Sequence, residues 1–364
     1  MLANQVLQKI IGDINEIIKK DCSVWDTKGE CLAQAGMTAG ELGREVARFL
    51  SEAKSGHDFL KTEKAAYFAV FHEEKLSYVF AVHCVCEQVE MIGQLCVNQF
   101  ENLIQAYKKR VDKNRFFQQL ILDNMLLVDV YNQAKKLSVE IETKRVVYVI
   151  EPKKDGDNLV METIKGLYTA GNKDYVTSVD EGHVILIKAL APTDGYREVN
   201  EIARTIVDML GAEAMVDARV SYGTIIEELK DVSKCYKEAS MALDVGRIFY
   251  VEKNVLAFNE LGIGRLIHQL PVSLCEMFLK EVFHGIDMDS FDKETLTTVN
   301  AFFDNDLNIS ETARKMYLHR NTLGYRLDKI LRTTGLDVKK FDDALTFKIA
   351  LMVSDHMKFL TSQE

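Results

Sequence analysis

The sequence has little proline and no long apolar run. Only 3 of its 364 residues are proline, while 47% are hydrophobic, which is ample for folded cores. No uninterrupted apolar stretch approaches the roughly 18 residues that a membrane-spanning helix requires. The opening residues, Met-Leu-Ala-Asn-Gln, carry neither the basic nor the apolar part of a secretory signal. We therefore expect a folded cytoplasmic protein that does not enter a membrane.

The cysteines show neither the pattern of a disulfide framework nor that of a zinc site. The 7 cysteines are an odd number and include no Cys-x-x-Cys pair, so we expect no disulfide framework and no zinc site. Cys84 and Cys86 lie on one face of a predicted strand, where core packing is favoured over redox sensing. No Ser/His/Asp or Cys/His spacing indicates catalysis. We predict no enzyme, no catalytic or metal-binding residue and no cofactor.

The chain is acidic, but one segment is not. A formal net charge of -10 argues against a general affinity for nucleic acid. Between Glu311 and Arg332 the cations are Arg314, Lys315, Arg320, Arg326, Lys329 and Arg332, against the acids Glu311 and Asp328, which gives a local charge of +4. Contact with phosphates needs such a local excess, and we expect it to be sensitive to salt.

The same segment has the pattern of a helix-turn-helix at residues 308–334. Ser310 is expected to cap a first helix that ends near Met316, and Gly335 to end the second helix. Apolar residues at helical spacing in the second helix are expected to be buried: Leu323, Leu327, Ile330 and Leu331. Outward-facing residues at its start would meet a major groove: His319, Arg320, Asn321, Thr322 and Arg326. An ordinary helical hairpin with a solvated basic face has the same spacing.

A resemblance to a known family favours the first of these two interpretations. The run Ala313 to Leu327, with its core His-Arg-Asn-Thr-Leu-x-Tyr-Arg-Leu, resembles the C-terminal helix-turn-helix of the PucR/CdaR family, bacterial regulators of purine catabolism and sugar-diacid use. The resemblance implies that His319 to Thr322, Tyr325 and Arg326 read DNA, and we add Lys329 to this set. Gly324 departs from the family, which usually has a basic residue there.

At the N-terminus, residues 1–110 have the helix and strand order of a small PAS- or GAF-like sensor. A helix over 1–20 precedes two short strands around Asp26–Gly29, a helix over 38–54 and a hairpin within 67–85. Such a sheet presents a concave face to a small ligand.

The family often has a sugar-diacid recognition domain in this place. The opening helix and Val24-Trp-Asp-x-x-Gly-Glu are similar to it, but the family's His-Glu-Gly-Ala motif is missing. The implied effector is a carboxylic or sugar acid, and a dicarboxylate needs two convergent cationic or amide-rich sites. The candidate effector-binding residues are Arg44, Arg48, Lys64, His72 and His83.

Residues 87–137 predict a nearly continuous helix with a break near Asp112–Asn114, and 111–139 form a helical connector. A stripe of mostly apolar residues recurs at alternating spacings of three and four: Val89, Ile92, Cys96, Gln99, Leu103 and Ala106. This stripe would pack on its own domain or form a dimer seam, and the two uses are compatible.

Residues 140–260 predict the order β-α-β-β-α-β of a ferredoxin-like fold, with a last strand over 214–222 and then a helix over 229–247. The region resembles the palm fold of diguanylate cyclases. Their hairpin needs Gly-Gly-(Asp/Glu)-Glu-Phe, in which glycines admit the nucleotide and acids hold magnesium. Asp180 and Glu181 remain here without the paired glycines. We interpret the domain as degenerate and non-catalytic, and for Glu151 we favour a solvated strand end over a leftover metal ligand.

These expectations describe an α+β multidomain protein. It would have a PAS/GAF-like sensor, a degenerate GGDEF-like middle domain and an all-α DNA-binding domain over 261–364. We expect a homodimer that binds double-stranded operator DNA and responds to a small-molecule effector. Two alternatives remain: a nucleotide-binding sensor or enzyme built on the middle domain, and a scaffold whose helix-turn-helix binds another protein.

Overall fold

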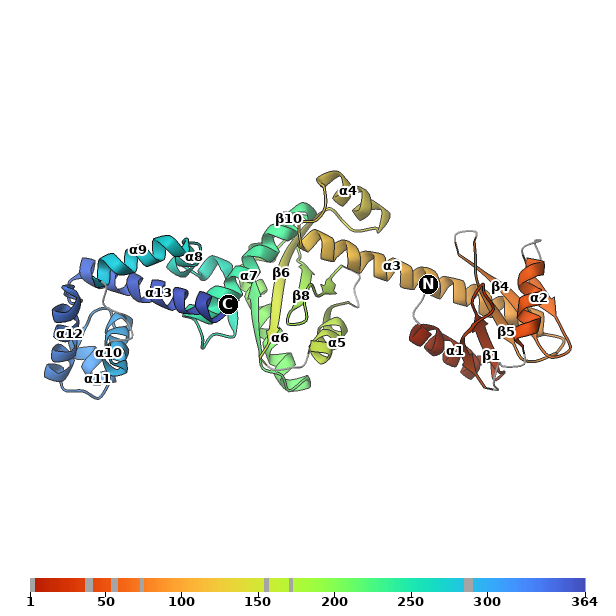
Figure 1. The fold of residues 1–364 in the computed structure, drawn as a ribbon, viewed down its shortest axis with the longest axis horizontal. Helices are drawn as coiled ribbons and strands as arrows, with labels where there is room; N and C mark the ends of the chain where they lie inside the picture. Colours follow the sequence, from red (N-terminus) through yellow and green to blue (C-terminus); the bar gives the residue numbers. More distant parts are fainter. Residues whose placement is uncertain are drawn as a thin grey trace. The chain divides into compact units, whose positions relative to one another are not determined.

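The computed structural model describes residues 4–36, 42–53, 58–72, 75–153, 157–169, 173–284 and 291–363. The chain divides into two compact units, Met1–Arg115 and Phe116–Glu364. Helix α3 (Val89–Ile121) crosses the boundary between them (Figure 1). Across the described ranges, no helix combines the length and the apolar character that a membrane span requires.

The first unit is a single antiparallel sheet with helices on both of its faces. Its strands are ordered β2-β1-β5-β4-β3. In chain order its elements are α1 (Asn4–Ile18), β1 (Cys22–Trp25), β2 (Cys31–Ala35), α2 (Gly43–Ala53), β3 (Phe59–Lys61), β4 (Ala66–His72), β5 (Lys75–Val82) and the first part of α3. The predicted strand pairs are therefore present, and they join into one sheet.

Successive side chains of the central strands point to opposite faces of the sheet, so apolar residues pack on both sides of it. Phe68 of β4 packs in the core formed with α1 and α3, while its neighbour Tyr67 packs with Phe49 of α2 on the other side. The rings of Phe49 and Tyr67 lie 6.1 Å apart. On this side α2 packs against the sheet, and the concave ligand-binding face stays a prediction.

Helix α3 differs from the prediction in two ways: it has no break near Asp112–Asn114, and it ends well before residue 137. It runs unbroken through Asp112–Asn114, which contain neither proline nor glycine, and it ends near Asp123, whose φ is 60°. The helix α4 (Leu127–Lys136) follows. Val89 and Cys96 of the predicted stripe are buried in the core of the first unit. Packing on its own domain is therefore confirmed for these two residues, whereas Gln99 and Ala106 of the stripe are exposed.

The middle part of the second unit has the predicted β-α-β-β-α-β order. Its elements are β6 (Glu142–Pro152), α5 (Asp157–Tyr168), β7 (Tyr175–Thr177), β8 (Val184–Ala189), α6 (Tyr196–Glu213), β9 (Ala218–Tyr222), β10 (Ile226–Glu228), α7 (Val232–Phe249) and β11 (Val255–Ala257). The sheet order is β11-β9-β6-β8-β7, and β10 pairs with β6. The last predicted strand begins at Ala218 rather than 214. A 3-10 turn, Leu229–Asp231, precedes α7 where we predicted one long helix.

The C-terminal part is helical. It contains α8 (Ile263–His268), α9 (Val272–Phe283), α10 (Lys293–Asp304), α11 (Ile309–Lys315), α12 (Arg320–Thr334) and α13 (Phe341–Gln363). Phe283, Phe291 and Phe347 meet edge to face, with ring centroids 5.8–6.3 Å apart. Helix α13 also packs on α7 and α8, so the helical part and the sheet belong to one compact unit.

Candidate nucleic-acid interface

The first helix of the predicted helix-turn-helix begins two residues earlier than we expected. Asn308 caps α11, and its Oδ1 accepts a hydrogen bond from the Glu311 amide at 3.0 Å. Ser310 lies inside the helix, so its predicted capping role is wrong. Asparagine and serine are about equally good caps, and the position of Asn308 at the end of the preceding turn decides which one is used. Ala313 is buried in the helical core.

The turn between α11 and α12 lies at Tyr317 and Leu318, as the sequence predicts, but the backbone conformation of Tyr317 was not predicted. Tyr317 has a φ of 56° and its side chain is 97% exposed. A bulky side chain in the left-handed region costs about 1 kcal/mol or more. The amide of Leu318 closes the turn by donating to the Ala313 carbonyl at 2.9 Å. No composition signal marks such a position, because glycine or asparagine is expected there.

Helix α12 agrees with the prediction at both ends and in its buried face. His319 is the N-cap, with its Nδ1 accepting from the Asn321 amide at 3.3 Å. Gly335 ends the helix with a φ of 79°, and its amide donates to the Leu331 carbonyl at 2.8 Å. The buried residues are Leu323, Leu327, Ile330 and Thr334. Leu331 is only half-buried.

The first turns of α12 leave polar side chains in solvent. Arg320, Asn321 and Thr322 are exposed, and Tyr325 is 64% exposed. Within the described residues Arg320 forms no ion pair. This group, together with the cap His319, offers hydrogen-bond donors and acceptors that fit base edges and phosphates.

The other two predicted DNA-binding residues have partners inside the domain. Arg326 donates from Nη1 to Thr298 Oγ1 at 3.0 Å and from Nη2 to Glu294 Oε2 at 2.7 Å. Lys329 forms an ion pair with Asp292. Both cations therefore contact the start of α10.

Other ion pairs reduce the local positive charge that the sequence indicates. Arg314 pairs with Glu311 at 2.7 Å, and Lys339 pairs with Asp328 at 2.7 Å. With Asp292 and Glu294 brought close by the fold, the cations that remain without a carboxylate partner carry most of the attraction for phosphate. Arg320 is the best placed of them.

The candidate effector residues of the first unit that the structure describes differ in exposure and in their partners. Arg44, Arg48 and Lys64 are exposed, and Arg48 pairs with Glu52 one turn along α2 at 2.9 Å. The side chain of the fourth candidate, His72, lies outside the described residues.

His83 is the candidate with a defined environment. Its Nε2 lies 2.8 Å from Ser23 Oγ, which also accepts a hydrogen bond from the Trp25 indole at 2.8 Å. Burial lowers the pKa of His83, although Asp21 opposes this effect. The environment therefore favours a neutral imidazole near pH 7, which is a poor partner for a carboxylate.

The hairpin of the middle domain holds a second group of charged residues. Arg247 of α7 contacts Glu151, donates to Asp244 Oδ1 at 2.9 Å and lies 3.3 Å from His183 Nε2. His183 Nδ1 in turn lies 2.9 Å from Asp180 Oδ1. The side chain of Glu151 is only 19% exposed. Our interpretation of it as a solvated strand end is therefore wrong.

This arrangement does not fit the magnesium ions that a cyclase needs. The Arg247 guanidinium already neutralises Glu151, the carboxylate at the end of β6, so a divalent cation there would meet a fixed positive charge. Among the described residues, no group of three or more His, Cys, Asp or Glu side chains is placed to hold a metal ion.

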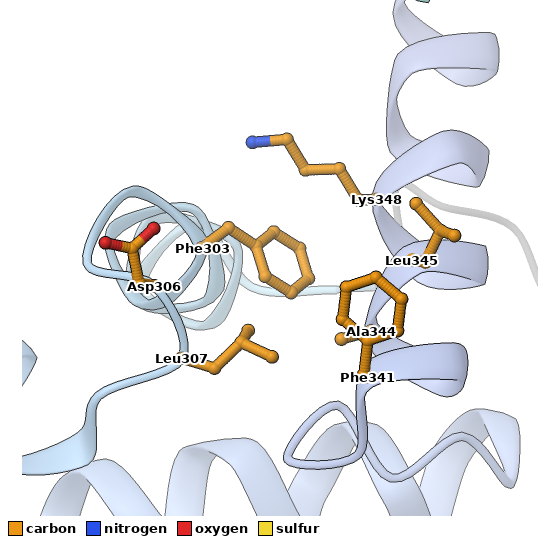
Figure 2. A pocket seen from close by; sticks show the side chains of 7 residues that line it. All are labelled: Phe303, Asp306, Leu307, Phe341, Ala344, Leu345 and Lys348. Atoms are coloured by element: carbon orange, nitrogen blue, oxygen red, sulfur yellow. The ribbon is translucent and has the colours of Figure 1, made fainter.

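The helical domain also has a shallow apolar hollow of about 330 Å³. Figure 2 shows Phe303 and Leu307 on one side of it and Phe341, Ala344 and Leu345 of α13 on the other. Lys348 extends across the edge, 5.3 Å from the centre of the Phe303 ring and 3.8 Å from Asp304. None of the sites predicted from sequence includes this hollow. Its two sides come from segments that lie before α11 and after α12, and sequence patterns do not reveal that such distant segments meet.

Comparison with protein families finds matches in both parts of the second unit. Residues 295–353 match the PucR C-terminal helix-turn-helix domain, and residues 124–245 match a GGDEF-like domain. The first match spans α11 and α12, and the second includes the Glu151 and Asp180 hairpin region.

Individual relatives are distant. The chain is 27% identical to the purine catabolism regulatory protein of Bacillus subtilis, over 46% of this chain and 32% of that protein. It is 24% identical to an uncharacterised protein of Haemophilus influenzae, over 73% and 72% of the two chains. It is 22% identical to the carbohydrate diacid regulator of Escherichia coli, over 61% and 60%. The match therefore spans about a third of the length of the Bacillus relative.

Proposed function

We propose that this chain, which belongs to the PucR/CdaR family of transcriptional regulators, binds double-stranded operator DNA through α12. The observation that carries the proposal is the exposed polar start of a capped second helix, held on a buried apolar face. Arg320 would contact a guanine edge or a phosphate, and Asn321 would pair with adenine. His319, Thr322 and Tyr325 would set the register of the helix on the duplex.

A dimer is part of the proposal. Helix-turn-helix proteins place two recognition helices in successive major grooves, so their half-sites lie about 10 base pairs apart or at multiples of that spacing. An acidic chain with a small basic surface gains most from pairing two such surfaces on one duplex. Cytoplasmic localisation follows from this role.

The effector is proposed to be a small carboxylic or sugar acid that binds the PAS/GAF-like first unit. Support comes from the diacid regulator among the relatives and from the cations Arg44, Arg48 and Lys64. Binding would change the relative placement of the two DNA-binding domains through α3. Crosslinking of those domains with and without the true effector tests this, and the same crosslinks in both states would contradict it.

Footprinting on the region upstream of the gene tests the function itself. We expect protection of two half-sites at a multiple of about 10 base pairs, which weakens steeply as salt rises. The absence of protection at low salt, with and without a panel of candidate acids, would overturn the proposal. Binding of another protein to α12 in place of DNA would support the scaffold alternative.

A further inference from the structure

We propose that Arg326 and Lys329 act as positioning residues, which fix α12 on α10 and leave DNA contact to the turn and to the exposed residues from Arg320 to Tyr325. This inference rests on the proposed function. It assigns two cations of α12 to positioning the helix, where the sequence had assigned them to DNA contact. Their spacing of three residues places them on the same side of α12, facing the start of α10.

Arg326 is held by two acceptors one helical turn apart on α10. Its Nη2 donates to Glu294 and its Nη1 to Thr298, at 2.7 and 3.0 Å. The Arg326 side chain is only 21% exposed, and Thr298 is fully buried. To reach a phosphate, the guanidinium would have to leave both acceptors, and the buried Thr298 hydroxyl would keep only the bond that it donates to the Glu294 carbonyl at 2.7 Å.

Lys329 attaches α12 to the N-terminus of the same helix. Its partner Asp292 is the N-cap of α10, and Asp292 Oδ1 accepts from the Thr295 amide at 2.7 Å. Lys329 and the Thr295 amide hold the pKa of Asp292 well below its usual range. One carboxylate thus caps α10 and binds α12.

The bonds from Arg326 and Lys329 fix the rotation of α12 about its own axis, which the apolar core does not. Leu323, Leu327 and Ile330 bury α12, but hydrophobic contact is not directional and tolerates small rotations about the helix axis. Directional bonds from Arg326 and Lys329 to α10 restrict that rotation. Rotation would move Arg320 and Asn321 relative to a groove, so the attachment sets the direction in which they point.

The two possible roles of Arg326 predict opposite effects for Glu294. If Arg326 contacts DNA, Glu294 competes with phosphate, so Glu294→Arg should strengthen operator binding. If Arg326 positions α12, the same change breaks the attachment and should weaken operator binding. Arg326→Glu weakens binding in both cases, and only the positioning role predicts recovery when the two changes are combined.

The experiment uses the full chain and fluorescence anisotropy on an operator duplex and a scrambled duplex, below the unfolding temperature of every variant. We expect Arg326→Glu and Glu294→Arg each to lower the ratio of operator to scrambled affinity about tenfold, with most of the loss recovered in the double variant. Arg326→Ala should lower the same ratio and leave the salt slope unchanged, whereas a lost phosphate contact lowers the slope by about 1.

Two further variants separate position from charge. Glu276→Arg makes the same charge change on an exposed residue of α9 and should leave the ratio unchanged. Thr298→Val removes one acceptor of Arg326 without changing charge, and it should lower the ratio. Stronger operator binding by Glu294→Arg, or no recovery in the double variant, would overturn the inference. Failure of the wild type to bind any duplex would instead overturn the proposed function.

Discussion

The middle domain and the helical domain each gather arginine and carboxylate side chains, but they use them in opposite ways. In the middle domain Arg247 is enclosed by Glu151, Asp244 and His183. In the helical domain two carboxylates of α10 bind Arg326 and Lys329, while Arg320 remains in solvent. In the first group the arginine is paired with carboxylates, whereas in the second Arg320 has no carboxylate partner among the described residues.

The difference shows that residue type alone does not identify a binding site. Glu151 has the chemistry of a metal ligand, yet the fold supplies its countercharge from Arg247 of α7. Arg320 and Arg326 are the same residue six positions apart, and only the first is without a carboxylate partner among the described residues. Whether a charge is already paired decides what it can bind.

The largest effect is expected from removing the enclosed cation. Arg247→Met leaves Glu151 and Asp244 without their partner and should lower the free energy of unfolding by about 2–3 kcal/mol, somewhat less than for a fully buried pair. Arg197→Met removes an 85% exposed arginine of α6 that pairs with Glu201, and it should change stability by less than about 0.5 kcal/mol. Chemical denaturation of both variants checks this, and equal losses would contradict an enclosed role for Arg247.

A smaller effect is expected at the open surface. Asn321→Ala should weaken operator binding by about 1–2 kcal/mol, because it removes a base contact. Its salt slope should stay that of the wild type, since no phosphate contact is lost. Binding to a scrambled duplex is the control and should not change. A uniform loss on both duplexes would show that Asn321 does not read sequence.

Two helical glycines differ in the space around them: one is surrounded by packed side chains, and the other has open space where a side chain would lie. An added Cβ at Gly324 meets nothing within 4 Å, whereas at Gly93 of α3 it would lie 1.9 Å from the Phe68 ring. Gly324→Ala should stabilise the helical domain by about 1 kcal/mol, and Gly93→Ala should destabilise the first unit by about 1–3 kcal/mol. Thermal unfolding distinguishes the two signs.

Gly324→Arg restores the basic residue that is usual in the family, and the open space admits it. We expect a salt slope that is steeper by about 1, with Gly324→Ala as the control for helix stability. An unchanged slope would place residue 324 away from the DNA backbone.

The smallest expected effect concerns pH. Burial lowers the pKa of His356, and His268, whose ring centroid lies 5.3 Å away, lowers it further. The unfolded chain therefore binds a proton more readily, so stability is lost as pH falls below about 6.5. His356→Phe should flatten the dependence of Tm on pH between 8 and 5 relative to the wild type. An unchanged profile would contradict this assignment.

The local parts of this account could be predicted from sequence, and the long-range parts could not. Helical spacing identified Leu323, Leu327 and Ile330, and Gly335 marked the end of α12. The partners of Arg326 and Lys329 lie 32 and 37 residues earlier in the chain, and Arg247 is 96 residues from Glu151. Periodicity carries no information about such pairs, which depend on tertiary packing.

Local rules also failed where two residues satisfied them equally. Asn308 and Ser310 are both good caps, and the geometry of the preceding turn selected the first. Asp112–Asn114 looked like a break because it is polar, but a helix continues through polar residues when neither glycine nor proline interrupts it.

The most direct test of the central claim is the binding of wild type and Arg320→Ala to duplexes from the upstream region, measured by fluorescence anisotropy over a series of salt concentrations. Arg197→Ala, an exposed arginine of the middle domain, is the matched control. We predict that the wild type binds one duplex, that Arg197→Ala binds it equally, and that Arg320→Ala loses about 1–3 kcal/mol with a salt slope lower by about 1. Equal binding by wild type and Arg320→Ala, or no binding at low salt with any candidate acid, would contradict the account.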